Sequence, residues 1–196
     1  MELDANLGLP DWKRFAIDNL GYGTNSKMML GFSGRPWYQL HGSNGSSYSD
    51  LDNHQNTWET NAIRATPNSA ILTDYSGGKR GAALNPSRMQ TEASRFLLDL
   101  DKVYPTASRY ASKNRKGEYV AHLENWSLNP LSKGSYTCNR PGYFTTIAEN
   151  EGRPVGNLFF AGEHTSSFYE WQGFMEGAAL SGLRAAGEAF ALLRGK

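Results

Sequence analysis

The residues whose types and spacing favour a binding site lie near the C-terminal end of the chain. An apolar run, Leu158–Ala161, precedes Gly162 and Glu163, and Gly173 and Gly177 flank the start of a long helical pattern. In open α/β sheets ligands bind beyond the carboxyl ends of strands, where glycine permits a tight turn and a carboxylate accepts hydrogen bonds from hydroxyl groups. Free amides at a helix start favour negative charge, so this spacing suits a flat or anionic group. The alternative is an ordinary strand-to-helix unit with a solvated Glu163.

The elements expected to position this segment are a short buried strand, 158–161, and a long helix, 174–194. The helix carries a large apolar face and a small-residue face, so we expect both faces to be buried, with close backbone approach on one side. The large face comprises Met175, Ala179, Leu183, Ala186, Phe190 and Leu193, and the small face Ala178, Ser181, Gly182, Ala185 and Ala189.

The rest of the chain mixes helical and extended patterns, and we expect an α+β (mixed α/β) fold. In Ser26–Ser33 strict alternation places Met28, Leu30 and Phe32 on one face, with Lys27 on the other. The Gly/Ser/Asn/Asp-rich stretch 41–56 predicts a surface loop. The other expected elements are helix 10–20, strands 57–60 and 70–75, a helix after Pro86 capped by Asn85, and strand 119–123.

Composition excludes several classes of protein. The chain has 20 Lys and Arg against 19 Asp and Glu, a balance unlike that of nucleic-acid binders. No apolar run approaches the roughly 20 residues that span a bilayer. The single cysteine, Cys138, excludes an internal disulfide and a cysteine-based metal cluster. We therefore expect a soluble protein that holds no metal and binds neither nucleic acid nor membrane; no targeting segment indicates its compartment.

Several segments resemble one known family, the flavin amine oxidases, which includes monoamine oxidases, polyamine oxidases and L-amino acid oxidases. Phe160–Glu163 followed by Gly173–Ala178 resembles their C-terminal flavin-binding signature. Tyr22–Lys27, Glu124–Trp126 and Gly134–Tyr136 resemble further family segments, in the same order. The resemblance implies FAD-dependent oxidation of the C–N bond of an amine or L-amino acid. The imine then hydrolyses to release ammonia, and dioxygen reoxidises the flavin to give hydrogen peroxide.

The resemblance also implies roles for individual residues. Lys27 would hold a water near flavin N5, whereas the alternative is a strand lysine pointing to solvent. Tyr136 and Phe174 would form two sides of an aromatic cage, and Trp171 would replace or extend the second side; ordinary core packing is the alternative. The implied cofactor contacts are Trp126 packed against the flavin, Glu163 on the ribityl chain, and Gly162, Gly173, Phe174 and Met175 near the flavin and pyrophosphate.

One departure from the family pattern concerns flavin attachment. Some monoamine oxidases bind the flavin covalently through a cysteine just before the cage tyrosine. Ser135 occupies that position here, and Cys138 lies beyond Tyr136. We therefore expect non-covalent FAD.

A second departure is the missing Gly-x-Gly-x-x-Gly turn that would follow a first strand and bind the pyrophosphate. We therefore expect the C-terminal part of such an oxidase: residues 1–126 mostly from the substrate-binding domain and 127–196 from the FAD-binding domain. Activity would need the N-terminal dinucleotide-binding part or subunit, and the chain alone would be inactive. The expected partners are an amine or amino acid and dioxygen, with further copies of the chain as an open alternative. The alternative is a non-catalytic fragment or binding module that keeps this fold without cofactor.

Overall fold

The computed structural model describes residues 4–60, 63, 66–166 and 171–195. The chain forms two compact units: unit 1 comprises residues 1–23 and 135–196, and unit 2 comprises residues 24–134. These bounds differ from the expected division at residue 126, because the N-terminal helix packs with the C-terminal segment. The assignment of the units to substrate and FAD binding stays a prediction.

The elements follow one another along the chain as helices, strands and single turns of 3-10 helix. Their bounds are η1 Ala5–Leu7, α1 Asp11–Asn19, β1 Ser26–Phe32, α2 Pro36–Gln39, β2 Ser47–Tyr48, β3 Asn56–Glu59, β4 Ala70–Ser76, α3 Gly78–Ala83, η2 Pro86–Arg88, α4 Met89–Val103, η3 Ala107–Tyr110, β5 Ala121–Asn125, α5 Tyr143–Thr146, η4 Glu163–Thr165 and α6 Met175–Arg194. The α+β expectation is confirmed, although β5 begins and ends two residues later than the predicted strand.

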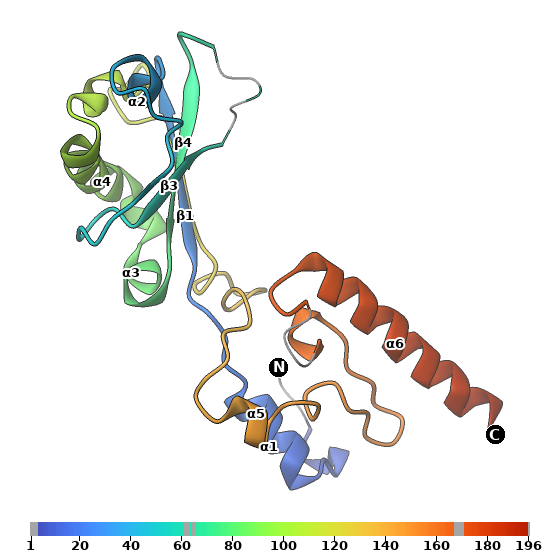
Figure 1. Ribbon diagram of the computed structural model, residues 1–196. Helices are drawn as coiled ribbons and strands as arrows, with labels where there is room; N and C mark the ends of the chain where they lie inside the picture. The colour runs from blue at the N-terminus through green and yellow to red at the C-terminus, as the bar shows by residue number, and fades with distance from the viewer. Residues whose placement is uncertain (1–3, 61–62, 64–65, 167–170, 196) are drawn as a thin grey trace. The chain divides into compact units, whose positions relative to one another are not determined.

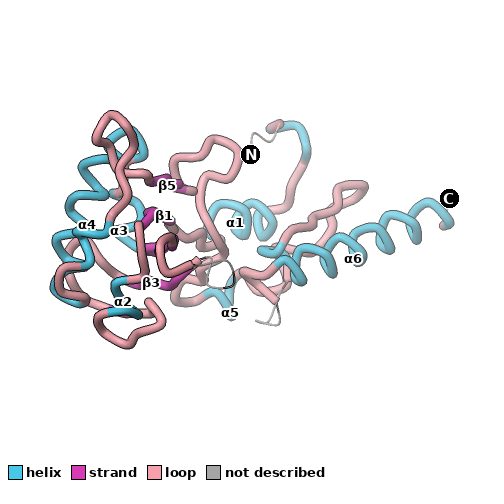
Figure 2. The backbone as a smooth tube through the Cα atoms, turned by 90° about the horizontal axis from the view of Figure 1, so that it is seen from above, coloured by secondary structure: helices cyan, strands magenta, loops and turns pink. Residues whose placement is uncertain are grey.

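Unit 2 is an antiparallel sheet of order β2-β3-β4-β1-β5 with helices on one face. In Figures 1 and 2, α2, α3 and α4 lie on the same side of this sheet. Met89, Ala93, Phe96, Leu97 and Leu100 recur at helical spacing and form the apolar stripe of α4, which meets the alternating apolar residues of β1 and β4. Each buried Leu or Phe contributes about 1.5–3 kcal/mol. The core includes Met28, Leu30, Phe32, Trp37, Leu72, Ala93, Phe96, Leu97, Leu100 and Leu123.

The opposite face of the sheet carries the other residues of β1. The side chain of Met28 is buried, while those of Lys27 and Met29 are half-buried, so the predicted alternation of this strand is confirmed. Lys27 is registered opposite Tyr75 of β4 and Glu124 of β5. On this face Lys27 therefore lies between Tyr75 of one neighbouring strand and Glu124 of the other.

The expectation of a surface loop at 41–56 is wrong in part. The segment contains β2 and the fully buried His54, whose ring accepts or donates hydrogen bonds at 2.9 Å from Ser47 Oγ and 2.6 Å from Ser49 Oγ. Burial lowers the pKa of His54, with Asp74 acting in the opposite direction. This segment is rich in turn residues and yet forms a structured hairpin, because the Ser47 and Ser49 hydroxyls hydrogen-bond to the buried His54 ring.

In its described residues, unit 1 contains η1, α1, α5, η4 and α6, joined by loops. The predicted strand at 158–161 does not form: within the described part of the chain, this segment makes only an isolated bridge between Leu158 and Val155. A strand needs a hydrogen-bonded neighbour along its length. The described residues of unit 1 supply none.

Helix α6 forms where the sequence predicts it, but its two faces are not buried as expected. Gly177 and Ser181 are buried, whereas Leu183, Phe190 and Leu193 are 72%, 56% and 71% exposed. The apolar pattern correctly predicts a helix, but burial also requires a second surface. Every helix in the described residues is too short or too polar to cross a membrane.

Candidate functional site

The side chain of Glu163, in the single turn η4, joins two distant segments of unit 1. Its Oε2 accepts the Gly173 amide at 2.6 Å. Its Oε1 accepts the Thr137 amide at 3.0 Å and the Thr137 hydroxyl at 2.9 Å. Burial raises the pKa of the nearby Tyr22 hydroxyl, and the Glu163 charge acts in the same direction. We call Glu163 with its three donors the Glu163 clamp.

The Glu163 clamp brings the predicted aromatic residues of unit 1 into one neighbourhood. A Cβ added at Gly173 would lie 2.8 Å from Tyr136 Cδ2, so the tyrosine ring packs directly on the glycine backbone. The rings of Trp171 and Phe174 meet edge to face with centroids 6.2 Å apart. Tyr136 is 49% and Phe174 61% exposed, so these rings are accessible and are not buried core residues of the described chain.

The glycines and the helix start have local structural reasons. A Cβ at Gly177 would lie 2.2 Å from the Trp171 carbonyl oxygen, so only glycine fits there. Gly162 has φ +130°, and its amide donates to Ser181 Oγ at 2.9 Å. Helix α6 has no side-chain cap at its N-terminus, and Met175 is 90% exposed. The first-turn amides of α6 are therefore uncapped beside the aromatic residues.

Lys27 and Trp126 lie in unit 2. Lys27 Nζ is 5.8 Å from the Trp58 ring centroid and 5.6 Å from that of Tyr75, within the range of cation–π attraction. The ring centroids of Trp58 and Tyr75 are 5.6 Å apart, and the Lys27 ammonium lies near both rings on this face of the sheet. Trp126 is half-buried and follows Asn125, whose buried amide donates to the Leu84 carbonyl at 2.7 Å.

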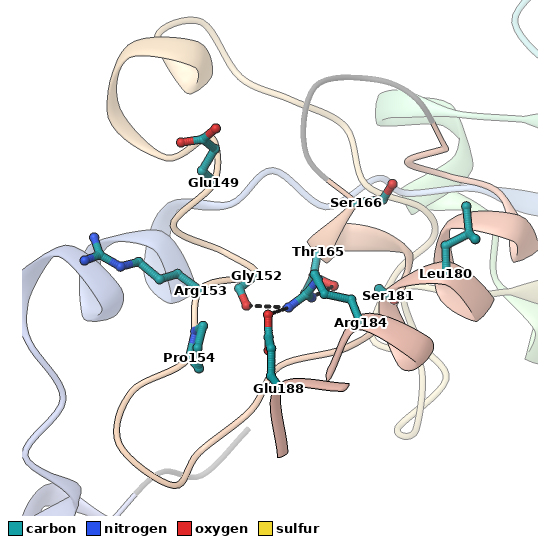
Figure 3. Close-up of a pocket in the computed structure, with 10 residues that line it drawn as sticks. All are labelled: Glu149, Gly152, Arg153, Pro154, Thr165, Ser166, Leu180, Ser181, Arg184 and Glu188. Carbon is teal, nitrogen blue, oxygen red and sulfur yellow. Dashed lines mark hydrogen bonds and ion pairs between the residues drawn. The ribbon is translucent and has the colours of Figure 1, made fainter. Parts of the chain in front are cut away.

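A cavity of about 460 Å³ in unit 1 is lined by none of the predicted site residues. Figure 3 shows Arg184 directed toward Gly152 and Glu188 within it. Arg184 donates to the Gly152 carbonyl at 3.0 Å, to Glu188 at 2.8 Å and to the Phe160 carbonyl at 2.8 Å. These bonds tie α6 to the loops of unit 1, which favours a structural role.

Unit 1 thus brings together Tyr136, Gly162, Glu163, Trp171, Gly173, Phe174 and Met175, and unit 2 holds Lys27 and Trp126 separately. Sequence reasoning missed Thr137, Trp58 and Tyr75, which contact predicted site residues. It also missed Gln172, which accepts a hydrogen bond from Asn139. Alternation along the strands places Trp58 and Tyr75 on the Lys27 face and was the signal available. Thr137 and Gln172 lie in segments without regular periodicity and gave no such signal.

The chain belongs to the flavin containing amine oxidoreductase family, whose profile matches residues 1–189. It is 30% identical to a putative L-amino-acid oxidase, YobN, of Bacillus subtilis (strain 168), over 90% of this chain and 35% of the relative. It is also 30% identical to polyamine oxidase 5 of Oryza sativa subsp. japonica, over 91% of this chain and 33% of the relative. The chain therefore spans about a third of the length of these relatives.

A solved structure has the same fold. Cyclohexylamine oxidase from Brevibacterium oxydans IH-35A superposes with a TM-score of 0.75 at 24% identity, over 95% of this chain and 39% of that chain. The mixed α+β architecture is therefore that of a flavin amine oxidase.

The residues of unit 1 fit the flavin that the family implies. An ionised carboxylate accepts about four hydrogen bonds. The Glu163 clamp uses three, which leaves capacity for one hydroxyl group. The uncapped start of α6 and the exposed Phe174 suit a flat, partly anionic group beside the clamp.

Proposed function

We propose that this chain forms part of the active site of an enzyme that oxidatively deaminates an amine or L-amino acid with non-covalent FAD. The observation that supports this most is the Glu163 clamp, which holds Thr137 and Gly173 together, with the Tyr136 ring packed on Gly173, the residue before Phe174. Accessible aromatic walls next to a carboxylate and an uncapped helix start suit an organic amine and a flavin.

The residues have distinct roles in this proposal. Glu163 would accept a hydrogen bond from a hydroxyl group of the ribityl chain. The backbones of Gly162, Gly173 and Met175 would contact the flavin and the pyrophosphate. Trp126 packs against the flavin ring. When bound, FAD supplies oxidation of the C–N bond, and dioxygen takes up the electrons as hydrogen peroxide while water hydrolyses the imine to release ammonia.

The remaining residues act on the substrate and on water. Tyr136, Phe174 and Trp171 give the substrate amine apolar walls and π-faces that orient it and exclude bulk water. Lys27, held over Trp58 and Tyr75, orients one water through its ammonium group. Orienting a water needs a hydrogen-bond donor that stays in place, and the Trp58 and Tyr75 rings near Lys27 favour this.

We also propose that a dinucleotide-binding part, in the same protein or in a partner, completes the FAD site. The support is the exposed apolar face of α6, where Leu183 and Leu193 are 72% and 71% exposed. An apolar surface of this kind marks an interaction site. Purified alone, the 196-residue chain is expected to bind FAD weakly, to turn over no amine and to self-associate through this face.

The test compares the recombinant chain with the native protein, isolated from its source with an antibody raised against residues 1–196. The native protein is expected to absorb at about 450 nm, to release FAD on acid denaturation and to form peroxide with amines or L-amino acids. A colourless native protein that takes up no FAD would contradict the proposal and favour a non-catalytic module with this fold.

A further inference from the structure

Unit 1 contains a hydrogen-bond network centred on a side chain outside the predicted site. The Gln172 side-chain oxygen accepts Asn139 Nδ2 at 2.8 Å, and its nitrogen donates to Tyr143 Oη at 2.9 Å. The same nitrogen donates to the His164 carbonyl at 3.4 Å. Tyr143 Oη in turn donates to Glu151 Oε1. We call the side chains of Asn139, Tyr143, Glu151 and Gln172 the Gln172 network.

One end of the Gln172 network is fixed in the core of unit 1. Tyr143 is 2% exposed and packs with Ala16 of α1 and with Ile147. The buried Lys13 ammonium donates to the Glu151 carbonyl at 3.2 Å. Burial lowers the pKa of Lys13 to about 8, although the Glu151 charge acts in the opposite direction. A buried cation, a buried carboxylate and a buried ring leave this end little freedom to move.

The other end reaches both aromatic segments. Asn139 lies three residues after Tyr136, and Gln172 lies between Trp171 and Gly173. The hydrogen bond from Asn139 to Gln172 therefore links the two segments that carry the walls.

The Glu163 clamp links the same two segments at neighbouring positions, Thr137 and Gly173. A single link leaves a segment free to pivot about it, whereas two links at different residues fix its orientation. Gln172 thus adds the second link and connects it to the core through Tyr143.

We propose that Gln172 is a positioning residue that sets the spacing and orientation of the Tyr136 wall relative to the Trp171 and Phe174 wall. The inference rests on the proposed function, because the walls are those of the proposed amine site. Gln172 acts through these rings. Its loss displaces the substrate and leaves the hydrogen bond between Glu163 and the flavin in place.

The first experiment needs no flavin. In the 196-residue chain, hydrogen exchange of the Gly173 amide is compared between wild type, Gln172→Met and Gln172→Glu. Loss of one tether is expected to speed this exchange about tenfold in Gln172→Met, with a smaller effect in Gln172→Glu, which keeps an oxygen for Asn139. Exchange in β1 of unit 2 is the internal control and should not change. Equal exchange at Gly173 in all three proteins would overturn the proposal.

The second experiment uses the flavin-loaded protein that contains this chain. Gln172→Met is expected to raise KM for the amine about tenfold while kcat and FAD affinity stay within about twofold, because displaced walls lose contacts with the amine that are equal in the ground and transition states. Tyr143→Phe should have the same effect, and the double variant should be no worse than either single one. Additive effects, or unchanged KM with lowered FAD affinity, would contradict positioning through the walls.

The two experiments separate this inference from the proposed function. If the wild-type protein takes up no FAD, the proposed function fails. The exchange rate of Gly173 still decides whether Gln172 holds the two segments together.

Discussion

The ring of Tyr136 lies on the backbone of Gly173, so closely that a Cβ on residue 173 would come within 2.8 Å of Tyr136 Cδ2. The same glycine has φ +82° and donates its amide to Glu163 at 2.6 Å. Gly173 thus packs against the Tyr136 ring, adopts a left-handed backbone conformation and donates a hydrogen bond to Glu163. The packing of the wall therefore depends on the absence of a side chain.

Gly173→Ala is expected to destabilise unit 1 by roughly 1–3 kcal/mol, because the backbone conformation is strained for alanine and the new Cβ displaces the Tyr136 ring. Urea unfolding followed by fluorescence measures the change. Gly187→Ala is the matched control: it is helical with nothing within 4 Å of an added Cβ, so it should stabilise by roughly 0.5–1 kcal/mol. Equal effects of the two substitutions would show that the ring does not depend on the glycine.

Glu163→Ala in the flavin-loaded protein is expected to weaken FAD binding more than it alters the rates of flavin reduction. A hydrogen bond to a charged group contributes about 1.5–3 kcal/mol, which corresponds to more than tenfold in Kd. FAD retention after desalting at low protein concentration is the measurement. Glu163→Gln keeps one acceptor oxygen and should lie between wild type and Glu163→Ala. Full retention by Glu163→Ala would assign Glu163 a purely structural role.

Lys27→Met is expected to slow flavin reduction or reoxidation and to leave FAD bound. Removal of a positioned polar group near the reacting centre costs about 2.7–4 kcal/mol, or 10²–10³-fold in rate. Stopped-flow spectroscopy of both half-reactions measures it. Lys27→Arg keeps a cation near Trp58 and Tyr75 and should retain more of the rate than Lys27→Met. Unchanged rates in both half-reactions of Lys27→Met would remove the lysine from the mechanism.

The sequence correctly predicted elements that depend on local pattern, and it wrongly predicted strand formation and burial where these depend on a partner surface. Alternation in β1 and the apolar stripe of α4 correctly predict strand, helix and buried face, because unit 2 supplies its own core. Residues 158–161 and the large apolar face of α6 follow equally clear patterns, yet the described chain gives the first no partner strand and leaves much of the second exposed. Periodicity states which residues prefer burial, and a second surface must exist to bury them.

The residues of the candidate site also divide into those that the sequence predicts and those that it does not. Tyr136, Glu163 and Gly173 were identified from family-like segments, and the structure brings them together. Their supports, Thr137 and Gln172, belong to irregular segments whose contacts depend on tertiary hydrogen bonds. A polar side chain in a loop carries no periodic signal, so these contacts could not be predicted from the sequence.

The stability of unit 2 is expected to fall as pH drops below about 6.5, because His54 is fully buried and its pKa is lowered from its ordinary 6.5 by burial. In this range the unfolded chain binds a proton that the folded chain does not, so stability rises with pH and is lost on acidification. Urea unfolding of wild type and His54→Asn between about pH 5 and pH 7.5 measures this. A steep pH dependence in His54→Asn equal to that of wild type would assign the effect to other groups.

The most direct test of the account is an anaerobic titration of the native flavin-loaded protein with amines and L-amino acids. The flavin absorbance at about 450 nm is expected to bleach on addition of substrate and to return when dioxygen is admitted, with one hydrogen peroxide and one ammonia formed per flavin reduced. A flavin that stays oxidised with every amine and L-amino acid, in a protein that retains FAD, would contradict amine oxidation at this site.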